Sequence, residues 1–222
     1  MLTDNWRVDL TRIAAVNRGV RLEVLTIGWM LVEAVVAVGA GIAARSVLLT
    51  AFGFDSVVEL LSGVVLYQRL QVESRGASEE DVDRLEARTT AISAVLLILL
   101  CAFVVLSSVG GLVLRIEPEG SMLGIAVSAI AIVAMPLLAW QKRRVNRVLA
   151  SPSLRADIAE SISCAYLAAV TLAGLAATLL FDWWWAQYVG AFALLIWLFP
   201  EAREAFWAWR DGEPQPIASP RV

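Results

Sequence analysis

The chain has 222 residues, of which 59% are hydrophobic, and a mean hydropathy of +0.71. This composition is too apolar for a soluble domain and indicates an integral membrane protein. The net charge of −3 is small, and the acidic residues lie mostly in loops or within apolar segments, so no nucleic-acid partner is indicated.

Six apolar segments follow one another along the chain, each close to the length of about 20 residues that a helix needs to cross a bilayer. They cover approximately residues 24–44, 46–68, 90–114, 121–141, 156–181 and 183–200. The predicted fold class is therefore an all-α membrane protein with six transmembrane helices. We expect three parts, which are a cytoplasmic N-terminal segment over 1–21, a six-helix transmembrane domain over 22–210 and a short disordered cytoplasmic tail over 211–222.

Basic residues indicate which side of this arrangement faces the cytoplasm. Of the 18 lysines and arginines, all but Arg45 and Arg115 fall on one side once the six segments are drawn. Because basic loops tend to remain in the cytoplasm, both termini are predicted to be cytoplasmic. We expect no cleavable signal peptide at the N-terminus, and we expect a multi-pass protein of a bacterial inner (plasma) membrane. The charged connection over 69–89 is predicted to be a solvated cytoplasmic loop with a short helix.

Two of the apolar segments contain carboxylates at helical spacing. Asp55 and Glu59 stand four residues apart in "LLTAFGFDSVVELLSG", which places them on one helix face. In "LRADIAESISCAYLA", Asp157, Glu160 and Cys164 follow at i, i+3 and i+7, again on one face. A charged group at the centre of a membrane helix costs about 2.5 to 3.5 kcal/mol, so these acids need a partner, water or an ion.

The basic residues are expected at helix ends, where their side chains can reach outward to the membrane surface. They therefore offer no obvious partner for the buried acids. Asp55, Glu59, Glu160 and Cys164 could together form a tetrahedral site for a divalent cation. The alternative is that the acids pair with arginines or line a passive water pocket. Glu33, in the first segment, is either a secondary proton or metal relay or a locally hydrogen-bonded structural acid.

The same two stretches carry a resemblance to a known family. "SVLLTAFGFDSVVELLSG" and "LRADIAESISC" resemble the second and fifth transmembrane helices of cation diffusion facilitators, the six-helix metal exporters. In that family the second helix carries two Asp four residues apart, which Asp55 and Glu59 match. The fifth helix begins Ala-Asp-Ala, followed by a His and then an Asp. Aligning the Ala-Asp pair at 156–157 with that start places Glu160 at the His position and Cys164 at the second Asp.

The resemblance implies a transporter rather than an enzyme, with no catalytic residue and no cofactor. It is greatest to the small, histidine-poor branch that ends after the sixth helix, without the usual C-terminal cytoplasmic domain. A divalent transition-metal ion would be the transported substrate, exported from the cytoplasm by proton antiport through a central site in the membrane. Zn²⁺ is the expected ion, while the mixed set of carboxylates and a thiol leaves Co²⁺, Cd²⁺ and Fe²⁺ open.

By this resemblance the metal ligands are Asp55, Glu59, Glu160 and Cys164. Asp157 and Glu33 are possible accessory residues, because Asp157 could recruit cations at the cytoplasmic side or join the site. The expected partners are the metal ion, protons, the lipid bilayer and a second copy of the chain in a homodimer that uses transmembrane contacts. The alternative function is a membrane scaffold or assembly partner that retains the fold and does not transport.

Overall fold

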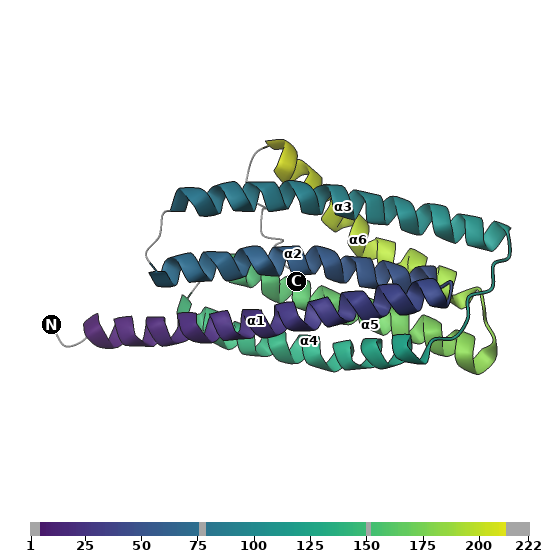
Figure 1. Ribbon diagram of the computed structural model, residues 1–222, viewed down its shortest axis with the longest axis horizontal. Coiled ribbons are helices and arrows are strands. Elements are labelled where there is room, and N and C mark those ends of the chain that lie inside the picture. The colour runs from purple at the N-terminus through teal and green to yellow at the C-terminus, as the bar shows by residue number, and fades with distance from the viewer. Residues whose placement is uncertain (1–4, 76–78, 150–151, 212–222) are drawn as a thin grey trace.

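A computed structural model describes residues 5–75, 79–149 and 152–211 of the chain. Within these ranges the chain forms six α-helices and no strand, as the predicted fold class requires. The helices run side by side along the long axis of the molecule (Figure 1). Their bounds are α1 Asn5–Ala43, α2 Val47–Arg75, α3 Glu79–Val113, α4 Met122–Leu149, α5 Pro152–Phe181 and α6 Ala186–Asp211.

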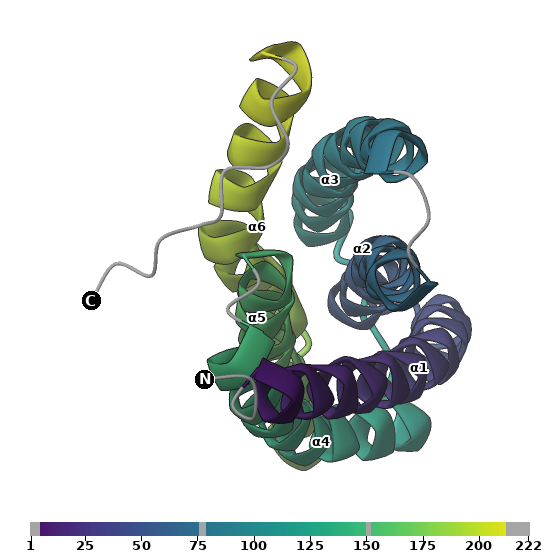
Figure 2. The same ribbon diagram turned by 90° about the vertical axis from the view of Figure 1, so that its left-hand side faces the viewer.

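Four of the helices form a ring, and the other two pack beside it. In the ring, α1 packs against α2 and α4, while α5 packs against α4 and α2. The helices α3 and α6 pack against each other, and this pair contacts the ring through α2 and α5 (Figure 2). The helix α2, which carries Asp55 and Glu59, thus contacts α1, α3, α5 and α6.

Five helices contain a stretch that is long and apolar enough to cross a membrane. These stretches are Ala14–Ala43, Val47–Gln68, Ala94–Val113, Met122–Leu149 and Asp157–Phe181. The helix α6 is not among them, because Gln187 lies near its start and Pro200, Glu201 and Arg203 follow its apolar part. It nevertheless packs along α3 and α5 within the same bundle.

The helices extend beyond the apolar segments on the side predicted to be cytoplasmic. The helix α1 begins at Asn5, inside the predicted N-terminal segment, and α2 continues to Arg75. The short helix predicted within 69–89 is present as the first turns of α3, which begins at Glu79. Residues 76–78 of that connection and 212–222 of the predicted tail lie outside the described residues. The boundaries of the three predicted parts remain predictions.

On the opposite side, each of the three connections between helices begins with a sharp turn. The residues that follow α1, α3 and α5 include Arg45, Arg115 and Asp182, with φ of 52°, 50° and 54°. Left-handed residues at these positions are typical of helix C-caps, where they allow the chain to turn sharply. The helix α2, which follows the turn at Arg45, is capped at its N-terminus, because Ser46 Oγ accepts a hydrogen bond of 3.1 Å from the Leu49 N–H. These turns fix the relative height of consecutive helices.

Glycines bring α1 and α2 into close contact. A Cβ atom added at Gly53 would lie 2.6 Å from the Val38 nitrogen, and one added at Gly41 would lie 2.6 Å from the Thr50 nitrogen. Real Cβ atoms do not approach backbone atoms so closely, so both sites require glycine. Small residues at helix interfaces allow such backbone approach in membrane proteins. The consequence is that polar side chains of α1 and α2 can reach each other directly.

Candidate metal site

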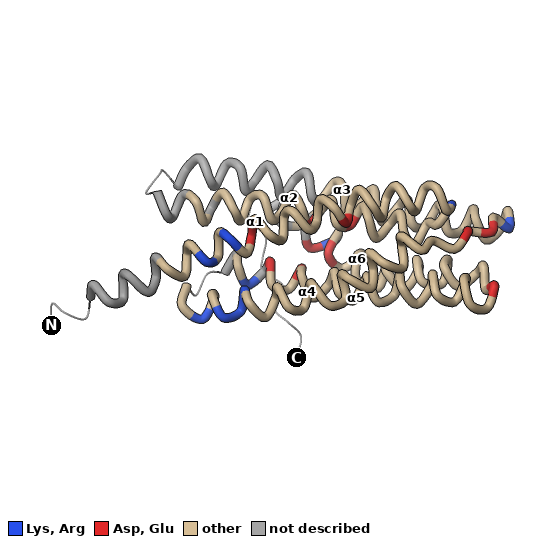
Figure 3. Tube along the Cα trace, turned by 60° about the horizontal axis from the view of Figure 1, so that its bottom comes forward, with Lys and Arg blue, Asp and Glu red and all other residues tan. Residues whose placement is uncertain are grey.

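The predicted ligands of α2 lie inside the bundle. Asp55 is only 4% exposed, and Glu59 is half-buried. The Oε2 atom of Glu59 is shielded from solvent and has no hydrogen-bond partner. Acidic positions occur in the middle of the bundle, whereas most basic positions gather toward one end (Figure 3). A buried carboxylate oxygen without a partner is costly in a membrane and is the kind of group that a bound cation stabilises.

On α5, the predicted ligand Cys164 contacts α1. Its side chain is fully buried, and its thiol donates a hydrogen bond of 3.3 Å to Glu33 Oε1. The same oxygen accepts a hydrogen bond of 2.7 Å from Ser56 Oγ on α2. Glu33 therefore joins α1, α2 and α5 at the level of the predicted site. The structure brings the accessory residue Glu33 together with one of the four predicted ligands.

Electrostatic interactions connect the acids of four helices. Glu59 lies near enough for its charge to interact with those of Asp55, Glu160, Glu33 and Glu201. Like charges repel strongly in an interior of low dielectric constant. In the part of the chain that the structure describes, the ion pairs do not include Asp55, Glu59 or Glu160. These acids thus form one group of interacting carboxyl groups within the bundle.

The four predicted ligands do not converge on one point. Among the described residues, no three Asp, Glu or Cys side chains are arranged so that they could hold a metal ion together. Cys164 faces Glu33, so coordination by Asp55, Glu59, Glu160 and Cys164 requires side-chain rearrangement. The assignment of these four residues as metal ligands therefore stays a prediction.

Asp157, the other possible accessory residue, has a basic partner. Its Oδ2 atom lies 2.5 Å from Lys142 Nζ, and the same nitrogen lies 3.1 Å from Glu23 Oε2. Lys142 is 1% exposed and Glu23 is 0% exposed. The expectation that the basic residues lie at helix ends and reach outward is wrong for Lys142, because α4 continues past it to Leu149. Two carboxylates compensate the charge of this buried ammonium group.

The helical period of α4 indicates that Lys142 is buried, and the prediction of segments from their length did not consider this period. Buried positions in α4 recur every three or four residues and include Met135, Leu138, Lys142 and Val145. This is the period of one helix face, so the lysine lies on the buried face of α4. Glu23 was missed for a similar reason, since it precedes the first predicted segment by one residue.

Glu201 is a further acid that the sequence analysis did not select. It follows Pro200 in α6, and its Oε1 accepts a hydrogen bond of 2.6 Å from Trp197 Nε1. Its charge interacts with those of Asp55 and Glu160, so α6 contributes to the same group of acids. No pattern within α6 indicates this proximity, because it results from the packing of α6 on α5.

The comparison with protein families agrees with the residues described above. The cation efflux transmembrane domain family matches residues 24–209, which begin near the middle of α1 and continue into the last turns of α6. Among curated proteins, no match was found. The family match includes both acid-bearing helices, and the resemblance inferred from their motifs is confirmed. The chain therefore belongs to the cation efflux family, and it is an integral membrane protein with the transmembrane domain of a cation transporter.

Proposed function

We propose that the protein exports a divalent transition-metal ion, with Zn²⁺ as the main substrate, from the cytoplasm across a bacterial inner membrane. The observation that carries this proposal is the group of buried acids without a basic partner. Asp55, Glu59 and Glu160 form no ion pair within the described residues, and Glu59 Oε2 has no hydrogen-bond partner. A transported cation would supply the countercharge that the chain does not provide there.

The ligands that we propose are the carboxylates of Asp55, Glu59 and Glu160 and the thiolate of Cys164. Three oxygens and one sulfur suit a tetrahedral ion of intermediate softness, which favours Zn²⁺ and leaves Cd²⁺, Co²⁺ and Fe²⁺ as alternatives. Cys164 would have to turn from Glu33 Oε1 to reach the ion. Glu33, hydrogen-bonded to Ser56 and near Glu59, is placed to accept the thiol proton at that step.

Protons are the proposed counter-ion. Metal ligands must be deprotonated before they coordinate, so metal and protons compete for the same side chains. Release of protons when metal binds would yield exchange at a single location, without a separate proton pathway. Alternating exposure of that location would involve movement within the ring of α1, α2, α4 and α5. A homodimer would form through membrane-facing apolar surface, of which α3 has several exposed residues, including Leu99 and Leu106.

A second candidate function is a membrane scaffold that retains the fold and does not transport. The observation that favours it is the lack of convergence among the predicted ligands in the described part of the chain. A scaffold would need the helix contacts and not a site that is exposed to each side of the membrane in turn.

Transport in proteoliposomes distinguishes the two functions. The purified chain is reconstituted into liposomes that contain a metal-sensitive dye, and Zn²⁺, Cd²⁺, Co²⁺ or Fe²⁺ is added outside. The proposed exporter produces saturable Zn²⁺ flux above that of protein-free liposomes. Flux equal to that of protein-free liposomes for all four ions would contradict transport and favour the scaffold.

A further inference from the structure

Three buried charged residues lie outside the predicted set of four ligands. Lys142 of α4 contacts Asp157 of α5 at 2.5 Å and Glu23 of α1 at 3.1 Å. None of the three is more than 7% exposed. Two carboxylates surround one ammonium group, which leaves the cluster with one excess negative charge when all three groups are ionised. We refer to Glu23, Lys142 and Asp157 as the lysine cluster.

The lysine cluster lies on the cytoplasmic side of the predicted metal site. Asp157 precedes Glu160 by three residues in α5, which corresponds to about 4.5 Å along the helix. Glu23 precedes Glu33 by ten residues in α1, or about 15 Å. Both steps lead toward the helix ends that the basic residues assign to the cytoplasm. The charges of Asp157, Lys142 and Glu23 all interact with that of Glu160. The cluster therefore lies between Glu160 and the cytoplasmic ends of α1, α4 and α5.

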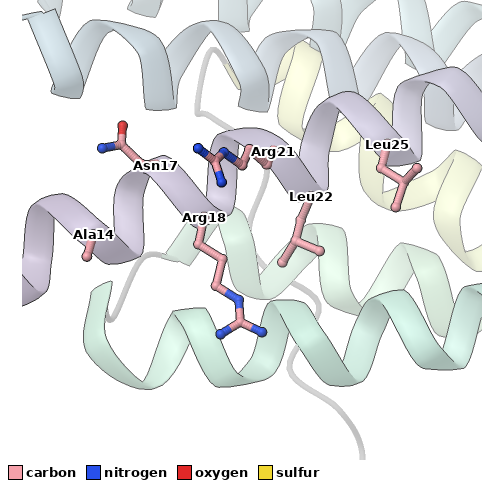
Figure 4. A pocket seen from close by; sticks show the side chains of 6 residues that line it. All are labelled: Ala14, Asn17, Arg18, Arg21, Leu22 and Leu25. Carbon is pink, nitrogen blue, oxygen red and sulfur yellow. The ribbon is translucent and has the colours of Figure 1, made fainter.

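A recess lies along α1 between residues 14 and 25, and Glu23, Lys142 and Asp157 do not line it. It has a volume of about 560 Å³, and its lining includes Leu22, the sequence neighbour of Glu23. Arg18 extends from this region of α1 toward α4 (Figure 4), where its Nη2 donates a hydrogen bond of 2.9 Å to Gln141 Oε1. Gln141 precedes Lys142 directly. Sequence neighbours of Glu23 and Lys142 therefore line the recess or bond to one of its residues, whereas the ion pair itself is buried.

The chemistry of the cluster suits a cation that can be exchanged. Carboxylate oxygens from two helices face one point, and a positive charge already occupies it. A lysine ammonium is a point charge on a flexible four-carbon chain, so it can move away without movement of the backbone. A divalent ion carries twice its charge and coordinates carboxylate oxygens directly. Such an ion can therefore replace the ammonium group between the same two carboxylates.

We propose that Glu23 and Asp157 form a second cation-binding site, on the cytoplasmic side of the predicted ligands, which Lys142 occupies as a tethered cation. An incoming divalent metal ion displaces Lys142, binds to the two carboxylates and then passes to Glu160. The ammonium group returns when the metal has moved on, so the carboxylates keep a countercharge throughout. The role of this site as a station in transport rests on the proposed metal export, whereas binding at the site can be measured separately.

Binding of Cd²⁺ alone to the purified full chain tests the site. In Lys142→Met the two carboxylates lose their tethered cation and become open to metal. Because Cd²⁺ must displace Lys142 in the parent, titration calorimetry should detect a Cd²⁺ affinity at this site about tenfold or more above that of the parent. Arg143→Met removes the same charge from the next, exposed position and should bind Cd²⁺ as the parent does. Equal stoichiometry and affinity in Lys142→Met and the parent would overturn the proposal.

A second variant decides the matter if Lys142→Met does not fold, since an unpaired buried charge is strongly destabilising. The triple variant Glu23→Gln, Lys142→Met, Asp157→Asn removes all three charges together. For Zn²⁺ supplied at the cytoplasmic face, its KM should rise about tenfold or more, while the maximal rate stays near that of the parent. An unchanged KM would show that the cluster is only a structural contact and would overturn the proposal. Absence of Zn²⁺ flux in the parent would instead refute the proposed export. In that case Cd²⁺ calorimetry on the triple variant tests the site. Loss of a Cd²⁺ ion that the parent binds supports the site, and binding equal to that of the parent overturns it.

Discussion

Replacement of Gly53 by alanine tests the close contact between α1 and α2. The new Cβ would lie 2.6 Å from the Val38 nitrogen and 2.7 Å from Val38 Cγ2. Ordinary contact begins at 3.4 Å, so α1 and α2 must separate by about 0.8 Å at this point. Such a shift would stretch the hydrogen bond of 2.7 Å from Ser56 to Glu33, one turn further along α2, to the limit of hydrogen-bond length.

The expected loss of stability follows from the cost of overpacking, which is about 1 to 3 kcal/mol. For a chain of this size, that corresponds to a melting temperature lower by about 3 to 10 °C. Thermal unfolding in detergent, followed by circular dichroism, measures the change. Gly28→Ala is the matched control, because no atom lies within 4 Å of its added Cβ. Its melting temperature should equal or slightly exceed that of the parent, since alanine favours the helix. A Gly53→Ala variant as stable as Gly28→Ala would refute the packing that positions Glu33.

Two further predictions concern the chemistry of the predicted ligands. Cys164→Asp should lower the preference for Cd²⁺ and Zn²⁺ relative to harder ions such as Mn²⁺, because a carboxylate replaces the soft thiolate. Metal affinities in unchanged order and ratio would show that Cys164 is not a ligand. Apparent metal affinity should rise with pH, because protons compete with metal for the same carboxylates and thiol, and an inward proton gradient should accelerate export. Liposomes with a metal dye and a pH dye measure both effects, and flux without proton counter-movement would indicate a channel or uniporter.

The six helices could be predicted because apolar stretches of membrane-spanning length are a strong and local signal. The polar extensions of the helices were not predicted from the sequence. The first turns of α1 from Asn5 and the end of α2 near Arg75 contain no apolar run. The helix α6 was predicted only over its apolar part, because Pro200 and Glu201 follow that part at once. Length and hydropathy therefore locate the membrane core of each helix better than its ends.

The site was predictable within each helix and not between helices. Spacing alone puts Asp55 and Glu59 on one face of α2, and the structure places both within the bundle. The contact of Cys164 with Glu33 joins residues 131 positions apart and depends on how α1 and α5 pack. The lysine cluster depends in the same way on three helices. Periodicity in α4 could have placed Lys142 on a buried face, but not identified its partners.

The central claim is that the acids of α2 and α5 form the transport site, and the most direct measurement is Zn²⁺ flux in variants that keep their shape. Asp55→Asn and Glu160→Gln each remove one charge from the group with almost no change in volume. Cys101→Ser, at a half-buried position of α3, is the control. In proteoliposomes of equal protein content, each acid variant should lose about 90% or more of the parent's flux, and Cys101→Ser should retain it. Flux at the parent's rate in both Asp55→Asn and Glu160→Gln would contradict the claim.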